Sequence, residues 1–298
     1  MLHDPTYVVL GGTGHIGSAT ARALLRSSRR VRVVTRSAEK AAAWAALGAE
    51  PAVADIEDPV AIARALASPS SEVRVFALNP PGSVAGDPDA DEDRTADAIV
   101  TALDAAPVER VVALSTYGAR PGRQIGDLGT LHRSESLLGD LNVPTAIVRA
   151  GYLFSNWDGA VETARTHGQV EVMLDPARAL PMVAPADVGR EAARLLQLDE
   201  PDRSVHHVEG PRRYTPADVA QAFADALGSP VAVERTPPER WRTAFLAAGF
   251  STAAADSFTG LTALANCDPW EVHGDPTRGT VTLQNYVDGL LTRDATER

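Results

Sequence analysis

Three glycines near the start of the chain are spaced so that a turn could hold a phosphate group. Gly11, Gly14 and Gly17 follow an apolar run at residues 7–10 and precede a stretch with helical character at 18–26. In a strand, turn and helix unit the first glycine permits the tight turn, the next lets a diphosphate approach the backbone, and the third lets the helix pack on the strand. The alternative is a purely structural turn. The pattern predicts a dinucleotide site formed by Gly11, Gly12, Thr13, Gly14, His15, Ile16 and Gly17.

The end of the second apolar run indicates which dinucleotide this turn would hold. Sites that select NAD place a carboxylate there, which binds the ribose 2′-hydroxyl. The stretch VRVVTRSAEK (31–40) instead ends in Thr35 and Arg36, and the chain's one lysine, Lys40, follows. A guanidinium and an ammonium suit a 2′-phosphate. We therefore expect NADP(H) bound through Thr35, Arg36 and Lys40, the alternative being a solvated basic helix start.

Two further turns fit the same cofactor. VADIED (53–58) places Asp55 and the N–H of Ile56 where they could bind the adenine amino edge, and FALNPPG (76–82) places Asn79 and Pro80 where a rigid segment could run along the cofactor. Either could instead be an ordinary turn after a strand.

The elements that must position these residues alternate along the first half of the chain. This alternation of strand-like and helix-like segments predicts βαβ units around a parallel sheet. Residues 82–93 are acidic and broken by glycine and proline, which predicts a solvated loop or, as an alternative, a mobile flap. The expected strands are 7–10, 31–35, 51–54, 73–78, 108–114 and 145–148, and the expected helices are 18–26, 40–47, 59–67, 91–105 and 132–138.

The pattern changes after residue 150, with longer irregular stretches and further helices at 185–198 and 213–228. We expect residues 1–150 to form the nucleotide-binding domain and residues 151–298 to form a smaller substrate-binding lobe. The two are expected to interleave, with the chain returning to the first around 183–208.

Composition excludes several classes of protein. The 298 residues carry a net charge of −11, which disfavours binding to nucleic acid or to an anionic membrane surface. One cysteine, Cys267, excludes an internal disulfide and a cysteine-based metal cluster. No run approaches the length of a transmembrane span. We expect a cytoplasmic protein, a monomer or homodimer, with a small-molecule partner and no metal.

The motifs VVLGGTGHIG, VRVVTRSAEK, VADIED, FALNPP, VVALSTYGA and PTAIVRAGYLFSN come in an order that resembles the NmrA-like group of atypical short-chain dehydrogenase/reductases. PMVAPADVGREAARLL and GTVTLQNYVDGLL extend the resemblance over nearly the whole chain. It implies an α/β fold with a Rossmann-type doubly wound parallel sheet, NADP(H), and a smaller C-terminal α/β lobe that closes over the nicotinamide. The group includes quinone reductases, isoflavone-reductase-like enzymes and non-catalytic NADP sensors.

The chain departs from ordinary short-chain dehydrogenases in its catalytic residues. Their Tyr-x-x-x-Lys pair is absent, since no tyrosine lies four residues before Lys40. Ser115 and Tyr117 follow the fifth expected strand, and His132 and Glu135 lie on the next helix, where quinone reductases of the group often carry a histidine and a glutamate. We expect Tyr117, His132 and Glu135 to be catalytic and Ser115 and Tyr152 to lie beside the nicotinamide.

These residues favour an NADPH-dependent reductase that passes hydride to a quinone or a similar small electrophile, without flavin or metal. Reduction of a quinone needs less acid catalysis than reduction of a ketone, because the negative charge falls on a stabilised phenolate-like oxygen. The missing pair leaves a second hypothesis open, a sensor that reports NADP(H) to a protein partner. A third is a tailoring reductase for a larger biosynthetic substrate.

Overall fold

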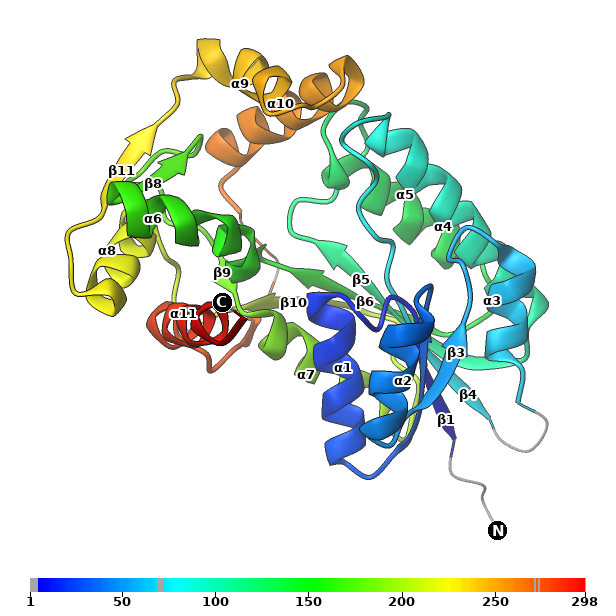
Figure 1. The fold of residues 1–298 in the computed structure, drawn as a ribbon. Coiled ribbons are helices and arrows are strands. Elements are labelled where there is room, and N and C mark those ends of the chain that lie inside the picture. Colours follow the sequence, from blue (N-terminus) through cyan, green and yellow to red (C-terminus); the bar gives the residue numbers. More distant parts are fainter. Residues whose placement is uncertain (1–4, 69–71, 271, 273, 298) are drawn as a thin grey trace.

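The central feature of the fold is a sheet of eight parallel strands in the order β12-β10-β6-β5-β4-β1-β2-β3 (Figure 1). The computed structural model describes residues 5–68, 72–270, 272 and 274–297. The six strands predicted from sequence are confirmed to within two residues. The strands are β1 (Thr6–Val9), β2 (Arg30–Thr35), β3 (Glu50–Val53), β4 (Val73–Ala77), β5 (Val108–Thr116), β6 (Thr145–Ala150), β10 (Val205–Glu209) and β12 (Thr277–Arg278).

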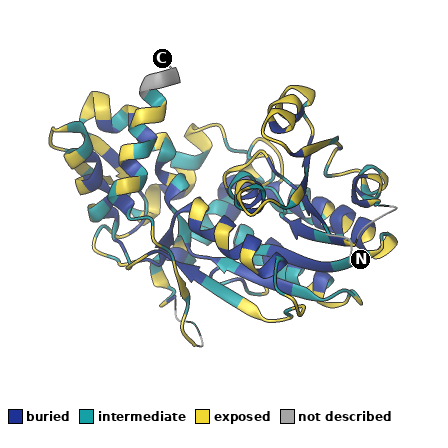
Figure 2. Cartoon of the chain, turned by 90° about the horizontal axis from the view of Figure 1, so that it is seen from below, coloured by how far each residue is buried: buried dark blue, intermediate teal, exposed yellow. Residues whose placement is uncertain are grey.

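Helices cover both faces of this sheet, as the doubly wound fold requires. One face carries α1 (His15–Arg26), α2 (Ala38–Ala46) and α7 (Pro185–Leu196), and the other carries α3 (Pro59–Leu66), α4 (Pro88–Ala105) and α5 (Asp127–Gly139). The central strands are buried from both sides, whereas the edge strands β3 and β12 and the outward faces of the helices are exposed (Figure 2). Strand order reverses between β1 and β4, which places a crevice for a ligand at the carboxyl ends of those two strands.

A second core lies beside the sheet and contains Phe154, Trp157, Tyr214 and Phe223. The elements of this part of the chain come from residues 152–183 and from residues after 213. They are β7 (Tyr152–Leu153), η1 (Phe154–Ala160), α6 (Val161–His167), β8 (Gln169–Val172), β9 (Met182–Val183), α8 (Pro216–Leu227), β11 (Ala232–Arg235), η2 (Pro238–Arg240), α9 (Trp241–Ala247), α10 (Thr252–Cys267) and α11 (Leu283–Glu297). All except η2 and α9 contribute to the core. Of the helices described, none is long and apolar enough to cross a membrane.

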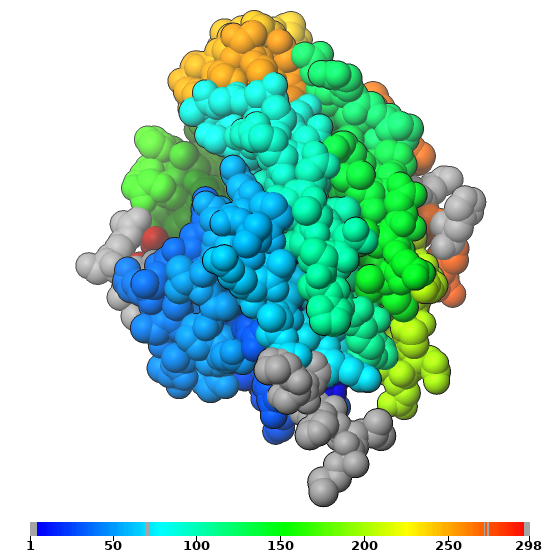
Figure 3. Space-filling model, turned by 90° about the vertical axis from the view of Figure 1, so that its right-hand side faces the viewer, coloured from blue at the N-terminus to red at the C-terminus, as the bar shows by residue number. Residues whose placement is uncertain are grey.

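Helices α9 and α10 extend from this second core back to the start of α4 (Figures 1 and 3). The backbone N–H of Ser251, just before α10, donates to the carbonyl of Val84 at 2.8 Å. The loop that was predicted over residues 82–93 is therefore held against α10 in its first part.

Three helices begin at least three residues earlier than the sequence predicted, and α1 is one of them, because it starts at His15 instead of 18. Helix α4 begins at Pro88, not 91, because Asp87 accepts a hydrogen bond from the N–H of Ala90 at 3.2 Å and proline fits the first turn. The prediction of a loop is therefore wrong for residues 88–93, which form the start of α4. Helix α5 begins at Asp127, five residues before the predicted start, directly after Gly126 with φ +58°.

Candidate functional site

The glycine-rich turn lies at the crevice between β1 and β4 and leaves no room for larger residues at three of its positions, Gly11, Gly12 and Gly17. Gly11 has φ +66°, and a Cβ there would lie 2.9 Å from Leu78 Cδ2 at the end of β4. A Cβ on Gly17 would lie 2.2 Å from the carbonyl oxygen of Gly11, so α1 can pack on the turn only through glycine. Gly14 differs, because its nearest neighbour would be 3.6 Å away. The turn is thus tightly packed on its inner side and open at Gly14.

The N-terminus of α1 is left without a side-chain cap. Gly14 occupies the cap position, and the first turn of the helix contains no acidic residue. The helices α5, α6, α7 and α9 also lack a side-chain cap, whereas five others are capped by Ser37, Asp58, Asp87, Thr215 and Ser251. Uncapped N–H groups and the helix dipole favour an anion. Together with the open space at Gly14, this N-terminus fits a diphosphate, and His15, Ile16 and Gly17 would supply the N–H groups.

The end of β2 presents two cations to solvent. Thr35 is buried and accepts a hydrogen bond from the N–H of Ser37 at 3.2 Å, and Ser37 in turn caps α2. Arg36 and Lys40 are exposed, and neither pairs with a carboxylate of the described residues. Both side chains are therefore available to a phosphate ligand.

The other two predicted cofactor turns have different surroundings. Asp55 is exposed, and its carboxylate accepts the N–H of Glu57 at 3.1 Å, while Ile56 is half-buried. The Asn79 amide donates to the carbonyl of Glu92 at 3.0 Å, and its buried Oδ1 has no hydrogen-bond partner within the described chain. Pro80 follows, half-buried. Asn79 thus retains a free acceptor at the end of β4.

Ser115 and Glu135 form a cluster with Arg149. Ser115 and Arg149 are register neighbours on β5 and β6. The Ser115 hydroxyl donates to Glu135 Oε1, and the Arg149 guanidinium binds both carboxylate oxygens of Glu135, at 2.8 and 2.6 Å. Sequence reasoning did not find Arg149. Glu135 is committed to this pair, which fixes α5 to the sheet.

This pair is largely shielded from water, so its loss is expected to reduce stability. Glu135→Gln removes the charge and leaves Arg149 without its carboxylate, which we expect to lower the free energy of unfolding by about 2 kcal/mol. Asp97→Asn, at the exposed pair with Arg133, is the matched control and should change it by less than about 0.5 kcal/mol. Urea titration of both variants measures the difference. Equal effects would contradict the structural role of Glu135.

Tyr117 belongs to the second core. Its hydroxyl donates to Glu209 Oε1 at 3.0 Å, and Glu209 also binds Arg278 at 2.7 Å. Burial, followed by the negative charge of Glu209, raises the pKa of the Tyr117 phenol above its usual range. Tyr117 therefore holds its proton tightly in a buried network.

His132 and Tyr152 have freer polar atoms. His132 is half-buried, and its Nδ1 has no hydrogen-bond partner within the described chain. Tyr152 has the Asn156 amide within hydrogen-bond reach and packs on Trp157, with ring centroids 5.7 Å apart. The structure thus gives Tyr117, His132 and Glu135 three different sets of neighbours and does not join them in one hydrogen-bonded group.

The family follows from comparison with known proteins. A family model described as NAD(P)H-binding matches residues 11–198, which run from the glycine turn to the end of α7 and include every cofactor residue discussed above. The chain belongs to this NAD(P)H-binding family. Its glycine turn, uncapped α1 and parallel sheet are the parts of the fold that such binding needs.

One relative of this NAD(P)H-binding protein and two solved structures similar to it cover most of its length. An NAD(P)H azoreductase from Xenophilus azovorans is 26% identical over 261 residues, which cover 88% of this chain and 87% of the relative. An NADPH-dependent quinone oxidoreductase from Escherichia coli, solved with NADPH, is 21% identical with a TM-score of 0.72 over 96% of this chain and 99% of that one. A triphenylmethane reductase from Citrobacter sp. is 16% identical with a TM-score of 0.79 over 97% and 99%. The two structures show the same fold.

The carboxyl group of Glu92, which was not predicted from the sequence, connects the segment after β4 of this NAD(P)H-binding protein to α5. Glu92 on α4 is buried, accepts the N–H of Gly82 at 3.1 Å, and also accepts the hydroxyl of Thr130. Burial is the largest cause that raises the pKa of Glu92 to about 7. Glu92 therefore changes charge within the physiological range.

Because the folded state raises this pKa, it binds the Glu92 proton more tightly than the unfolded state does. The stability from protonated Glu92 is present below about pH 4.5 and is lost as pH rises toward 7. Glu92→Gln mimics the protonated form, so it should match the wild type at pH 4.5 and exceed its unfolding free energy by up to about 3 kcal/mol at pH 8. Chemical unfolding at both pH values measures this. A variant that is less stable at pH 8 would overturn the assignment.

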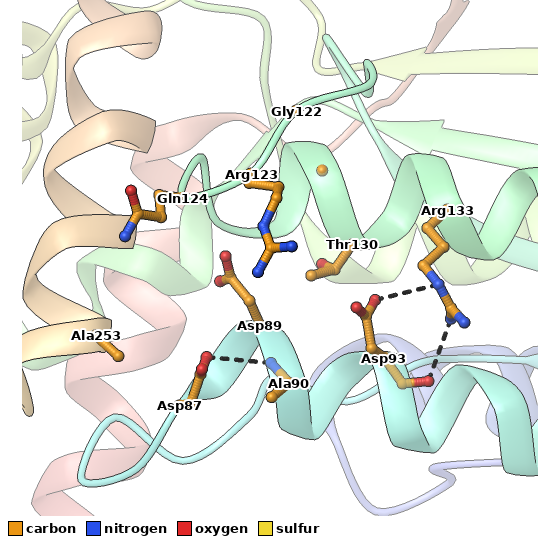
Figure 4. A pocket seen from close by; sticks show the side chains of 11 residues that line it. Asp87, Asp89, Ala90, Asp93, Gly122, Arg123, Gln124, Thr130, Arg133 and Ala253 are labelled. Atoms are coloured by element: carbon orange, nitrogen blue, oxygen red, sulfur yellow. Dashed lines mark hydrogen bonds and ion pairs between the residues drawn. The ribbon is translucent and has the colours of Figure 1, made fainter.

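A cavity of about 290 Å³ lies on the outer side of α4 and α5, where residues 122–124 and α10 meet them (Figure 4). Asp89 and Arg123 point toward one another across it, and Arg133 pairs with Asp93. None of the residues predicted from sequence to bind cofactor or substrate lines this cavity. It is separate from the crevice at the carboxyl ends of the strands.

Proposed function

We propose that this protein is an NADPH-dependent reductase that transfers hydride directly to a quinone or a similar conjugated electrophile. The observation that carries the proposal is the uncapped α1 N-terminus behind a glycine turn, with two unpaired cations at the end of the neighbouring strand. The diphosphate would lie on the turn, and Arg36 and Lys40 would bind the 2′-phosphate. A bidentate guanidinium suits that group better than any other side chain does.

Residues at the ends of β5 and β6 would form the reacting half of the site. When bound, the reduced nicotinamide supplies a hydride. Tyr152, which is half-buried and packs on the buried Trp157, presents an aromatic ring suited to a flat acceptor, and the unpaired Nδ1 of His132 is free to bind either the cofactor ribose or the acceptor. Ser115 is held in place through Glu135 and Arg149. Tyr117 would have a structural role in this half of the site, since its hydroxyl already donates to Glu209.

The names of the relatives agree with acceptors that are conjugated and electron-poor. The azoreductase, the quinone oxidoreductase and the triphenylmethane reductase are named for azo, quinone and triarylmethyl acceptors respectively. The shared chemistry of these acceptors supports a hydride reductase.

Isotope transfer tests direct hydride delivery. NADPH deuterated at C4 on the transferred side is incubated with the protein and a cationic triarylmethane dye, because the central carbon of the reduced dye does not exchange with water. Mass spectrometry should find deuterium at that carbon. Reduced dye that carries only solvent hydrogen would contradict direct transfer and point to an intermediate carrier.

A further inference from the structure

Reduction of a quinone by hydride leaves an oxygen that must take up a proton. The acceptor gains two electrons and one hydrogen from the reduced nicotinamide, and a second hydrogen must arrive as a proton to give the neutral hydroquinone. A positioned acid lowers the barrier to such a step. With the Tyr-x-x-x-Lys pair absent from the sequence, another group has to supply that proton.

Apart from His132, whose free Nδ1 is assigned above to the cofactor ribose or the acceptor, three candidate acids near the site are already committed to other partners. The Tyr117 hydroxyl donates to Glu209, and Glu209 is held by Arg278. Glu135 accepts hydrogen bonds from Ser115 and Arg149. Glu92 accepts the N–H of Gly82 and the hydroxyl of Thr130. None of these groups is free to bind an acceptor.

Asp127 differs from all of them. It is the first residue of α5, at the carboxyl edge of the sheet, and it is half-buried. Its carboxylate accepts only from its own N–H and that of Leu128, and no side chain of the described residues binds it. It lies close enough to Tyr152 for its charge to act on that phenol. Asp127 is thus a carboxyl group near Tyr152 that no side chain of the described residues binds.

Two further contacts define this position. The N–H of Gly126 donates to Ser257 of α10 at 2.9 Å, and Ser257 donates to Asp89 of α4 at 2.6 Å, which together fix the start of α5. On the other side, Tyr152 packs on Trp157, whose indole N–H is buried and lacks a partner within the described chain. A polar atom that is nine-tenths buried and unpaired beside Tyr152 indicates a place that a ligand completes.

We infer that Asp127 is the acid of this site, the residue that donates a proton to the oxygen of the acceptor as hydride arrives. This inference rests on the proposed reductase function. In the step, the O–H bond of the Asp127 carboxyl breaks, an O–H bond forms on the acceptor, and water later returns a proton to the carboxylate. Together with the hydride this gives hydroquinone and oxidised cofactor.

The surroundings suit the carboxyl to this role. Asp89 and Glu92 of α4 and Tyr152 of β7 are the titratable groups that interact with it. Burial is the main cause, and the charge of Asp89 a lesser one, that raises the pKa of Asp127 to about 6. A tenth of the molecules would then hold the proton at pH 7, and water could restore it after each turnover.

The first test compares turnover of Asp127→Asn with the wild type. The variant should reduce a naphthoquinone at least about 10-fold more slowly at pH 6. It should also lose the fall in kcat that the wild type shows above the pKa of Asp127. With a cationic triarylmethane dye, whose reduction needs no proton, the loss should be at least about 5-fold smaller. A wild-type pH profile retained in the variant, or equal losses with both acceptors, would overturn the inference.

The second test needs neither cofactor nor turnover. The protein without cofactor is titrated with 1-naphthol, a phenol that stands in for the reduced acceptor, at pH 7.5, where Asp127 is a carboxylate that can accept the phenol O–H. Asp127→Asn should bind it about 5-fold more weakly, while Asp93→Asn, on the outer face of α4, should bind it as the wild type does. Equal affinities in all three proteins would overturn the role of Asp127.

The outcomes distinguish this inference from the proposed function. If the wild type binds NADPH but reduces no acceptor, and naphthol binding still depends on Asp127, the reductase proposal fails while the carboxyl remains part of a ligand site. If the wild type reduces quinones but Asp127→Asn leaves its rate, pH profile and naphthol binding unchanged, only the assignment of Asp127 fails.

Discussion

Gly17→Ala is expected to abolish measurable NADPH binding and to destabilise the fold. The added Cβ would lie 2.2 Å from the carbonyl oxygen of Gly11 and 2.8 Å from its carbon. Both are backbone atoms of the turn, so α1 must move away from β1. We expect a loss of about 3 kcal/mol in unfolding free energy, as for other overpacked sites. The affinity for NADPH, measured by fluorescence titration, should fall at least about 100-fold, since the displaced N–H groups no longer meet the diphosphate.

Two other glycines provide matched controls for this substitution. Gly14→Ala should leave the thermal midpoint unchanged, because its backbone has φ −82° and the new Cβ meets nothing closer than 3.6 Å, yet it should weaken NADPH binding because it occupies the open side of the turn. Gly139→Ala, at the end of α5 with open space around it, should change neither property. If Gly17→Ala bound NADPH as tightly as Gly139→Ala does, the assignment of the diphosphate to this turn would be wrong.

Arg36→Ala is expected to raise the dissociation constant for NADPH about 30-fold and to change that for NADH less than about 3-fold. A charge-assisted contact with a phosphate is worth about 2 kcal/mol, and NADH lacks the 2′-phosphate. Arg36 has no carboxylate partner in the described chain that would have to be given up on binding. Lys40→Ala should have a smaller effect of about 5-fold, because an ammonium on a flexible stem binds as a point charge.

A control variant and the comparison with NADH distinguish a contact with the 2′-phosphate from other roles of Arg36. Arg94→Ala, which removes an exposed cation paired with Asp91 on α4, controls for the loss of positive charge and should leave both cofactors bound normally. Equal weakening of NADPH and NADH by Arg36→Ala would place this side chain on a part of the cofactor that the two share. The selectivity for NADPH would then need another explanation.

The fold was largely predictable because its strands are short apolar runs that alternate with helices, and the glycine turn identifies the first βαβ unit. The starts of α4 and α5 were missed for a local reason. Asp87 and Pro88 together begin a helix, but they lie in an acidic stretch that also fits a loop. At α5, the helix begins after a glycine with positive φ, which sequence reasoning treats as a break.

The missed start of α5 also accounts for what the sequence did not predict at the site. With the helix taken to begin at 132, Asp127 fell in a loop and drew no attention. Capping reasoning applied to the stretch before Leu128 could have found it. The partners of Glu135 and Tyr117 could not be found this way, because they are distant in sequence. Arg149 lies 14 residues after Glu135, and Glu209 lies 92 residues after Tyr117. Only the register of β5 on β6 and the return of β10 to the sheet bring them together.

The measurement that tests the central claim most directly is NADPH oxidation, followed at the absorbance of the reduced nicotinamide. The purified protein is given a panel of benzoquinones and naphthoquinones, with NADH run in parallel. We predict steady turnover with at least one quinone and a kcat/KM at least about 10-fold higher for NADPH than for NADH, as expected for a lost phosphate contact. Tight NADPH binding without turnover on any quinone would contradict the reductase account and favour a protein that senses NADP(H).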